Sequence, residues 1–303
     1  MYILTLTTKN GLYSHKRIKE AAEARGHKMR LMNTADCWIN LGDKVTISEE
    51  SELLSQNNKK LAAIIPFIGN NMTFFGTSVL RHLNCSSVFC LNTSASILRT
   101  RDKLRAHQVL AKKGLPMPKT SIAHSPEKTG AIIDAVGGAP VVVKLVSDST
   151  HGEGVVLAET RAAAVSVINA FNVLNTNILV QEFIEESSGR DLRCFVLGDK
   201  VVAAMERIAA EGEFRSNFHQ GGRTVSAKIS EEEEALAINA AKTLGLEMAG
   251  VDILRSNRGP LLLEVNAYPG FEGLELATGI DIANCIIEYI EQRVEALPMQ
   301  AVE

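Results

Sequence analysis

The chain has 303 residues, 46% of them hydrophobic and 22% charged, and its formal net charge is -3. This length predicts two or three packed units, and the composition is ordinary for a soluble globular protein. The small negative charge gives no general attraction to nucleic acid or to an anionic membrane, and no apolar run approaches the length that crosses a bilayer.

The cysteines and histidines argue against a metal or disulfide framework. The five cysteines are scattered, odd in number and without C-x-x-C spacing, which predicts free thiols in a reducing cytoplasm. The seven histidines include no pair at metal-ligand spacing. The first residues lack a basic leader and run straight into a strand-like segment, so no signal peptide is expected.

The first 92 residues alternate between strand and helix patterns. The predicted elements are a strand over Tyr2–Leu6, a helix capped by Ser14 and running to Arg25, and strands over Lys28–Met32 and Leu61–Pro66. This alternation predicts a small parallel α/β domain over residues 1–92. The first strand is not followed by G-x-G-x-x-G, so a dinucleotide site is not supported.

Residues 93–185 form the second predicted unit, in which strands carry a lysine and a strand-end glutamate. The predicted elements are helices over Arg101–Lys113 and Glu159–Leu174 and strands over Pro140–Val146, Val155–Leu157 and Ile178–Ile184. Gly114 follows the first helix, and prolines come soon after it, which is a typical helix end.

Residues 186–295 form the third predicted unit, and 296–303 a tail. The predicted elements are a hairpin of Leu192–Leu197 and Lys200–Glu206, a helix over Ser230–Leu244, a hairpin of Ala249–Leu254 and Gly259–Ala267, and a closing helix over Ile282–Arg293. Ser230 and Glu233 have the capping-box spacing that starts a helix. A polar turn, Arg255–Gly259, joins the two runs of the second hairpin.

The second hairpin carries a candidate metal site. Glu264 and Asn266 are two residues apart on one strand and therefore point to the same face. Asp252 on the partner strand can join them. Oxygen ligands of this kind suit a hard divalent cation such as Mg²⁺, which would offset the cost of placing carboxylates among apolar strands. The alternative is a pair of solvent-exposed acids at the strand edges.

Lys144 is a candidate phosphate contact. It lies within a run of valines and a leucine, and a loop rich in serine, threonine and glycine follows directly. Small residues permit backbone N–H groups to fold over phosphate oxygens, and an ammonium can meet a phosphate as a point charge. The chain has no G-x-x-x-x-G-K-[ST], so this is not a P-loop. The alternative is a lysine that protects an edge strand from aggregation.

Strand ends and loops supply further candidates for binding a nucleotide. Gln181-Glu182-Phe183-Ile184 ends a strand, where backbone groups can read the edge of a base and an aromatic ring can cover it. An ordinary strand end is the alternative. Arg215-Ser216-Asn217 precedes Gly221-Gly222, a pattern that suits an anionic group. Asp191 and Arg193 share a strand face, so a surface ion pair is the simpler interpretation of these two residues.

The order of these motifs resembles that of the ATP-grasp ligases. Within that superfamily the chain is most similar to the ribosomal protein S6 modification enzymes, which are ATP-dependent L-glutamate ligases. The phrases that carry the resemblance are Arg101-Asp102-Lys103-Leu104-Arg105, Ile122-Ala123-His124-Ser125-Pro126, Val136-Gly137-Gly138-Ala139-Pro140, Phe214-Arg215-Ser216-Asn217, and Asn257-Arg258-Gly259-Pro260 leading to Glu264-Val265-Asn266-Ala267. The resemblance extends over residues 1–293. It implies a mixed α/β (α+β) protein with an ATP-grasp fold behind an N-terminal pre-ATP-grasp domain.

The resemblance also implies a role for each candidate residue. ATP and two Mg²⁺ or Mn²⁺ ions are the implied cofactors. The implied assignments are the ATP phosphates for Lys103 and Lys144, the adenine hinge for Gln181, Glu182 and Phe183, the ribose side for Asp191, the γ-phosphate for Arg215, Ser216 and Asn217, and the metal ions for Asp252, Glu264 and Asn266. Arg215 is the implied catalytic group, because it can steady the oxygens of an acyl phosphate.

The reaction that the resemblance implies is an ATP-driven amide synthesis. A carboxylate attacks the γ-phosphate to give an acyl phosphate, and an amine then displaces phosphate. No protein nucleophile is needed, which agrees with a chain that shows no Ser/His/Asp or Cys/His arrangement. In this family the acceptor is the C-terminus of ribosomal protein S6 and the amine is L-glutamate, and a tetramer is suggested. The alternatives are another acceptor, or a nucleotide-binding scaffold without catalysis.

Some positions depart from the family pattern. Phe67 and Gln220 stand where arginine is usual in relatives, and Tyr268 replaces a small serine. None of these residues belongs to the nucleotide or metal set. All of them are expected near the substrate, so they leave the amino acid and the acceptor open.

Overall fold

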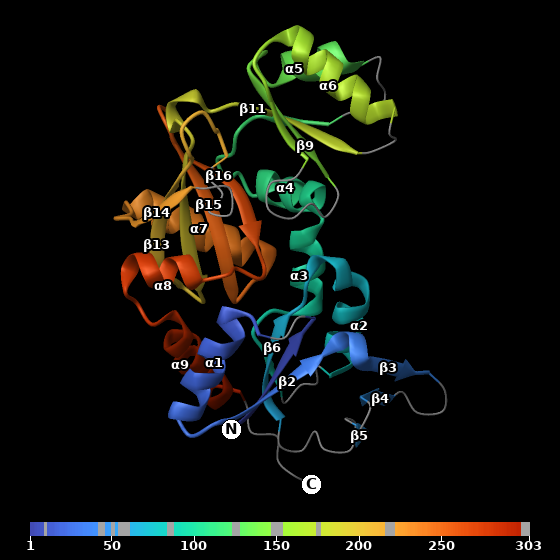
Figure 1. Ribbon diagram of the computed structural model, residues 1–303, viewed down its shortest axis with the longest axis vertical. Coiled ribbons are helices and arrows are strands. Elements are labelled where there is room, and N and C mark those ends of the chain that lie inside the picture. Colours follow the sequence, from blue (N-terminus) through green and yellow to red (C-terminus); the bar gives the residue numbers. More distant parts are fainter. Residues whose placement is uncertain are drawn as a thin grey trace.

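The structure is a computed structural model and describes residues 1–8, 11–41, 46–49, 52–53, 61–83, 88–122, 128–146, 154–173, 177–215 and 222–297. Its larger sheets are an N-terminal, a central and a C-terminal one, which occupy separate parts of the molecule (Figure 1). Helices α3 (Ser94–Arg101) and α4 (Lys103–Lys112) lie between them. Short 3-10 helices cover Thr34–Asp36, Asn70–Met72 and Glu185–Ser187.

The N-terminal sheet is parallel, as the sequence predicts. Its strands, in spatial order, are β2 (Lys28–Asn33), β1 (Tyr2–Thr7), β6 (Leu61–Phe67) and β7 (Phe89–Cys90). Helices α1 (Tyr13–Ala24) and α2 (Thr73–Leu83) belong to the same part of the chain, and β3 (Cys37–Asn40), β4 (Thr46–Glu49) and β5 (Glu52–Leu53) pair in a small antiparallel sheet. The predicted Ser14 cap is wrong, because Ser14 is buried inside the first turn and Leu12 is the N-cap residue.

The central sheet is antiparallel and is covered by two helices (Figure 1). Its strands, in spatial order, are β10 (Val155–Ala158), β9 (Val141–Leu145), β11 (Ile178–Glu182) and β8 (Thr120–Ser121), and the covering helices are α5 (Thr129–Ala135) and α6 (Arg161–Val173). The predicted helix Arg101–Lys113 corresponds to α4, which begins at Lys103, and the preceding helix α3 (Ser94–Arg101) was not predicted. The chain breaks at Asp102, whose carboxylate accepts a hydrogen bond from the backbone N–H of Arg105 and so caps α4.

The C-terminal sheet is antiparallel and contains both predicted hairpins. Its strands, in spatial order, are β14 (Arg223–Ser226), β13 (Lys200–Ile208), β12 (Arg190–Leu197), β15 (Met248–Ser256) and β16 (Gly259–Asn266). Helices α7 (Glu231–Leu244) and α8 (Glu272–Thr278) pack against this sheet. The predicted capping box of Ser230 and Glu233 is confirmed at the start of α7.

The end of the chain returns to the N-terminal sheet. Helix α9 (Ile282–Glu295) packs beside α1, and Figure 1 shows the two helices side by side. Arg25 joins them through ion pairs to Glu288 and Glu291. One cluster of buried side chains includes residues of the N-terminal sheet, the C-terminal sheet and α9, among them Phe67 and Phe195. The N-terminal and C-terminal sheets therefore share a core. Within the described ranges, no helix has the length and apolar character needed to cross a bilayer.

Candidate active site

Lys144 is a half-buried cation on an inner strand of the central sheet. Strand β9, which carries it, pairs with β10 on one side and with β11 on the other, so the interpretation of Lys144 as an edge-strand lysine is wrong. Its ammonium donates a hydrogen bond to Oε1 of Gln181 over 2.7 Å. Burial lowers the pKa of Lys144 to about 8, against the opposing effect of the Glu264 charge. An anion in contact with this group would favour its charged form.

The residues predicted to bind metal lie together on the C-terminal sheet. Asp252 of β15 is the register partner of Glu264 of β16, and Gly250 is the partner of Asn266. The three side chains therefore share one face of the hairpin. Carboxylate and amide oxygens are the ligands that Mg²⁺ and Mn²⁺ prefer, so this set fits such an ion. The described part of the chain contains no group of three or more His, Cys, Asp or Glu residues arranged for a metal ion.

A bulge in the second hairpin creates this shared face. The pairs next to the turn, from Ser256–Gly259 to Ile253–Leu262, follow one register. That register would place Asp252 opposite Leu263 and would turn Glu264 to the other face. The register shifts between Asp252 and Ile253, so Asp252 instead meets Glu264. Bulges are frequent beside functional sites, where they redirect a side chain.

A network of arginines and aspartates surrounds the Asp252 carboxylate. Arg193, its register partner on β12, contacts both of its oxygens, one of them at 2.7 Å, and Arg207 of β13 approaches to 2.9 Å. Arg207 also holds Asp191 through two hydrogen bonds of 2.6 and 2.7 Å. Burial raises the pKa of Asp252, but the charges of Arg193 and Arg207 outweigh burial and hold it below its ordinary value.

This network corrects one interpretation and adds one residue. Arg193 does not form the expected surface pair with Asp191, because it lies against Asp252 and its side chain is only 13% exposed. Arg207 is the residue that the sequence interpretation missed. In the first hairpin a register shift between Phe195 and Val196 brings Arg207, and not Glu206, opposite Asp191. Arg207 is a basic residue directly after the predicted strand Lys200–Glu206, and this position was the signal that could have marked it as a charge partner.

Lys103 connects the helical region to the metal-binding face. It is the first residue of α4, and its ammonium lies 3.9 Å from a carboxylate oxygen of Glu264. The charges of Glu264, Lys103, Asp252 and Asp191 all act on Lys144. The structure therefore brings together five of the residues predicted from sequence, which come from both the central and the C-terminal sheets and from α4.

The predicted adenine hinge has its glutamate side chain engaged elsewhere. The Glu182 carboxylate accepts hydrogen bonds from Arg258 over 2.8 Å and from the Lys119 backbone over 3.1 Å, and the Arg258 bond lowers its pKa. The backbone N–H of Glu182 donates to the carbonyl of Lys119. The ring of Phe183 meets the ring of Phe214 edge to face, with centroids 6.4 Å apart.

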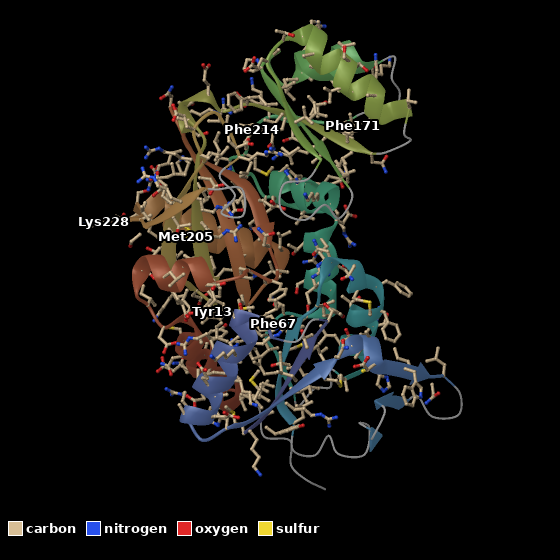
Figure 2. The ribbon with its side chains drawn as sticks, in the orientation of Figure 1. Tyr13, Phe67, Phe171, Met205, Phe214 and Lys228 are labelled. Carbon is tan, nitrogen blue, oxygen red and sulfur yellow. The ribbon has the colours of Figure 1, made fainter. Side chains whose placement is uncertain are left out.

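Arg215 lines a groove between the central sheet and the loop that follows β13. The groove has a volume of about 580 Å³ and is lined by Val155, Val156, Leu157, Glu159, Thr160, Ala163, Glu213, Phe214 and Arg215. Arg215 pairs with Glu213 at 2.8 Å and lies over the ring of Phe214, which Figure 2 shows between the two sheets. Hydrogen bonds from Arg215 lower the pKa of Glu213 to about 2. Ser216, Asn217, Gln220 and the loop after Lys144 lie outside the described residues.

Two residues that depart from the family pattern meet where the N-terminal sheet joins the metal-binding strand. Phe67 ends β6 and stacks on Tyr268, which comes two residues after Asn266, with ring centroids 4.4 Å apart. His15 also stacks on Phe67, with ring centroids 5.2 Å apart, and the Tyr268 hydroxyl lies 3.3 Å from Nε2 of His15. Figure 2 shows Phe67 at this junction.

Asn92 holds the same junction together through its side-chain amide. Its Nδ2 donates to the carbonyls of Met248 and Ala267, and its Oδ1 accepts from the backbone N–H groups of Glu247 and Met248. The buried amide is thus fully hydrogen-bonded. Its bonds join the start of β15 to the residue that follows Asn266.

Family models and relatives agree with this architecture. Residues 1–97 match the RimK pre-ATP-grasp domain, and residues 100–290 match the RimK-like ATP-grasp domain. A probable alpha-L-glutamate ligase of Legionella pneumophila is 51% identical over 300 residues, which cover 98% of this chain and 97% of the relative. A protein of the same description from Coxiella burnetii is 52% identical over 304 residues, which cover 99% and 98%.

Solved structures share the fold at low sequence identity. The ATP-grasp ligase PsnB, in complex with minimal precursor, Mg and ADP, has a TM-score of 0.73 at 19% identity and covers 97% of this chain and 98% of its own. A RimK domain protein from Sphaerobacter thermophilus has a TM-score of 0.70 at 21% identity, over 95% of this chain and 99% of its own. The predicted ATP-grasp fold with a pre-ATP-grasp domain is confirmed. The chain belongs to the RimK-like ATP-grasp family and is a carboxylate–amine ligase.

Proposed function

We propose that this ligase uses ATP to add L-glutamate to the C-terminus of a protein acceptor, ribosomal protein S6, with release of ADP and phosphate. The observation that carries the proposal is the convergence of Lys103 and Lys144 with Asp252 and Glu264 at the junction of the central and C-terminal sheets. The glutamate assignment is supported by relatives with 51% and 52% sequence identity that are described as probable alpha-L-glutamate ligases.

The nucleotide would lie with its phosphates toward the two lysines. The ammonium of Lys144 keeps N–H donors beyond the one that it gives to Gln181, because an ammonium has three. Phe183 offers an aromatic face for adenine, and the hinge backbone offers its edge contacts. Asp191 would lie on the ribose side. Arg215, Ser216 and Asn217 would approach the γ-phosphate, and Arg215 has to exchange its partner Glu213 to do so.

Asp252, Glu264 and Asn266 would hold two Mg²⁺ or Mn²⁺ ions. When bound, such ions neutralise the negative charge that develops on the transferring phosphoryl group. The residues of the chain add to this effect. Arg193 and Arg207 place positive charge beside Asp252 in a largely buried setting, where electrostatic interactions are stronger than in water.

The chemistry proceeds in two displacements. An oxygen of the acceptor carboxylate attacks the γ-phosphorus of ATP, the bond to the β-phosphate oxygen breaks, and ADP leaves. The glutamate amine then attacks the carbonyl carbon of the acyl phosphate, loses a proton, and expels inorganic phosphate to leave an amide. Arg215 would steady the acyl-phosphate oxygens, and no covalent enzyme intermediate is required.

A second candidate is the same reaction with a different acceptor or amino acid. The stacked rings of Phe67 and Tyr268 favour this candidate, because they occupy the junction close to Asn266, where the family resemblance leads us to expect arginine and serine. A stacked aromatic pair offers no cation to a substrate carboxylate. By family resemblance we also propose a homotetramer that works in the cytoplasm.

The test combines purified protein, Mg-ATP, L-glutamate and ribosomal protein S6, and reads intact masses, with controls that lack ATP or acceptor. A ladder of acceptor masses that rises by single glutamyl steps and depends on ATP is the expected result. An unmodified acceptor together with release of ADP and phosphate would show that S6 is the wrong acceptor. No ATP turnover with any amino acid would favour a nucleotide-binding scaffold.

A further inference from the structure

Three side chains of the central sheet form a hydrogen-bonded chain that ends on Lys144. Lys144 faces Leu179 across the β9–β11 pair, and Gln181 lies two residues further along β11, on the same face as Lys144. Thr120 of β8 is the register partner of Gln181 on the opposite side of β11. Gln181 is 2% exposed, so its amide lies inside the sheet region and is held by both neighbouring strands.

The hydrogen bonds of this chain have a fixed direction. The ammonium of Lys144 donates to Oε1 of Gln181 over 2.7 Å, and Nε2 of Gln181 donates to the Thr120 hydroxyl over 2.9 Å. That hydroxyl donates its single proton to the carbonyl of Pro118 over 3.0 Å. Because the hydroxyl proton is committed to Pro118, the hydroxyl must accept from Gln181, and the amide oxygen is left facing the lysine.

The reverse orientation of the amide would be unfavourable at both ends. It would turn the NH₂ group toward an ammonium, which has donors only, and would leave the carbonyl oxygen facing a hydroxyl whose proton is already used. A buried donor or acceptor without a partner is costly. The chain from Pro118 through Thr120 therefore determines which end of Gln181 meets Lys144.

We infer that Gln181 is a positioning residue that aims the ammonium of Lys144 at the phosphates of ATP, and that Thr120 fixes the amide of Gln181 for this task. The inference rests on the proposed role of Lys144 as a phosphate contact. It changes the expected role of the Gln181 side chain, which acts through the lysine instead of touching the adenine. Gln181 uses one of the three ammonium donors of Lys144 and leaves the rest for an anion.

A neutral acceptor suits this task better than a carboxylate. A glutamate at position 181 would form an ion pair with Lys144, which would cancel the positive charge that ATP meets and would hold the ammonium away from the phosphate. A methionine of similar length would leave the ammonium without its acceptor and free to take other rotamers. Both changes preserve side-chain volume, so they separate the charge and the hydrogen bond from packing.

The experiment measures the dissociation constants of ATP and of adenosine for the whole protein and for a small set of variants. Gln181→Met is expected to weaken ATP binding about tenfold, because a hydrogen bond to a charged group is lost. Gln181→Glu is expected to weaken ATP binding further. Thr120→Val is expected to weaken it by a smaller factor, because this change removes only the hydrogen bond that fixes the Gln181 amide. Adenosine carries no phosphate, so its binding is expected to stay unchanged in all three variants.

The controls separate this role from a merely structural one. Thr120→Ser retains the hydroxyl and is expected to restore the ATP affinity that Thr120→Val loses. Ser121→Ala changes the neighbouring residue of β8, which points to the other face of the strand, and is expected to have no effect. Wild-type ATP affinity in Gln181→Met and Thr120→Val would overturn the inference, as would equal losses for ATP and adenosine. Lys144→Met tests the underlying role: if it leaves ATP affinity intact, the proposed phosphate contact itself is wrong.

Discussion

Lys144 and Asp252 carry opposite charges in the same site, and their surroundings compensate those charges in different ways. Lys144 meets a neutral amide, and burial lowers its pKa to about 8. Burial raises the pKa of Asp252, but the charges of Arg193 and Arg207 outweigh it and hold the pKa low. The lysine therefore presents its charge to an incoming anion beside a neutral hydrogen-bond partner, whereas the carboxylate is already paired with its arginines.

Because of this difference, an anion and a cation meet different conditions at Lys144 and at Asp252. Among the described residues, the hydrogen-bond partner of Lys144 is the neutral side chain of Gln181, so a phosphate can approach the ammonium there without breaking an ion pair. A cation that binds Asp252 has to share its oxygens with Arg193 and Arg207, or displace them.

Removing Arg207 should have the largest effect, because it breaks the compensation on the carboxylate side. Arg207→Met leaves Asp191 without its bidentate partner and removes one of the two arginines at Asp252. Breaking a buried pair in this way is expected to lower the free energy of unfolding by about 3–5 kcal/mol. Urea unfolding measures it. Arg190→Met, which removes a half-exposed arginine paired with Glu206, is the control and should cost about 1 kcal/mol or less.

Replacing Glu264 with glutamine tests the metal-binding face directly. The change keeps the shape of the side chain but removes the charge that lies opposite Asp252 and 3.9 Å from Lys103. We expect turnover to fall about 10²–10³-fold, with a much smaller change in ATP affinity, because the lost charge acts mainly in the transition state. Glu272→Gln, at an exposed position on α8, is the matched control. Unchanged turnover would contradict the metal assignment.

The sequence indicated Lys144 and the three predicted metal ligands, but it did not indicate which charges meet in the C-terminal sheet, and strand register explains why. Lys144 and Gln181 lie on strands with a regular register, so the alternation of side chains along each strand is enough to show that they share a face. In the C-terminal hairpins, single-residue register shifts decide which charges meet. Counting residues back from the turn of the second hairpin would place Glu264 on the wrong face. Counting back from the turn of the first hairpin would pair Asp191 with Glu206.

Contacts between segments that are far apart in the sequence are harder to predict. Nothing in the local pattern around Asn92 indicates that its amide joins Met248 to Ala267, since such bonds depend on the packing of whole domains. The same holds for Phe67 and Tyr268, which the sequence marked separately and the fold brings into contact. Charge partners such as Arg193 and Asp252 are likewise set by the pairing of β12 with β15.

The pH dependence of stability tests the lysine side of the comparison. Lys144 has a pKa of about 8 in the folded protein, below its ordinary value of 10.5, so the unfolded chain binds more protons between these values. Stability from this group therefore rises with pH across that window, and the cost of the buried charge is fully present below about pH 8. Lys144→Met should stabilise the protein without ligand, by at most ~3 kcal/mol below pH 8.

The measurement is thermal unfolding of the wild type and Lys144→Met from pH 7 to pH 10.5. The stability difference is expected to shrink as the pH rises, because the wild-type lysine loses its proton and with it the burial cost. Lys144→Arg is the control that keeps its charge over the whole pH range, so the stability contribution of this side chain should not rise at high pH. A difference that is the same at every pH would mean that Lys144 is not held in an unfavourable environment.

Tyr268 tests a region that should leave both charged groups intact, and its effect should be the smallest. Tyr268→Phe removes the hydroxyl near His15 but keeps the ring that stacks on Phe67, so we expect a stability loss of about 1 kcal/mol and unchanged ATP affinity. Tyr268→Ser also removes the ring, which lies two residues from Asn266. If the stack positions the end of β16, Mn²⁺ affinity should fall in Tyr268→Ser and stay at the wild-type value in Tyr268→Phe. Equal Mn²⁺ affinities in both variants would show that the aromatic junction stabilises the fold without reaching the metal-binding face.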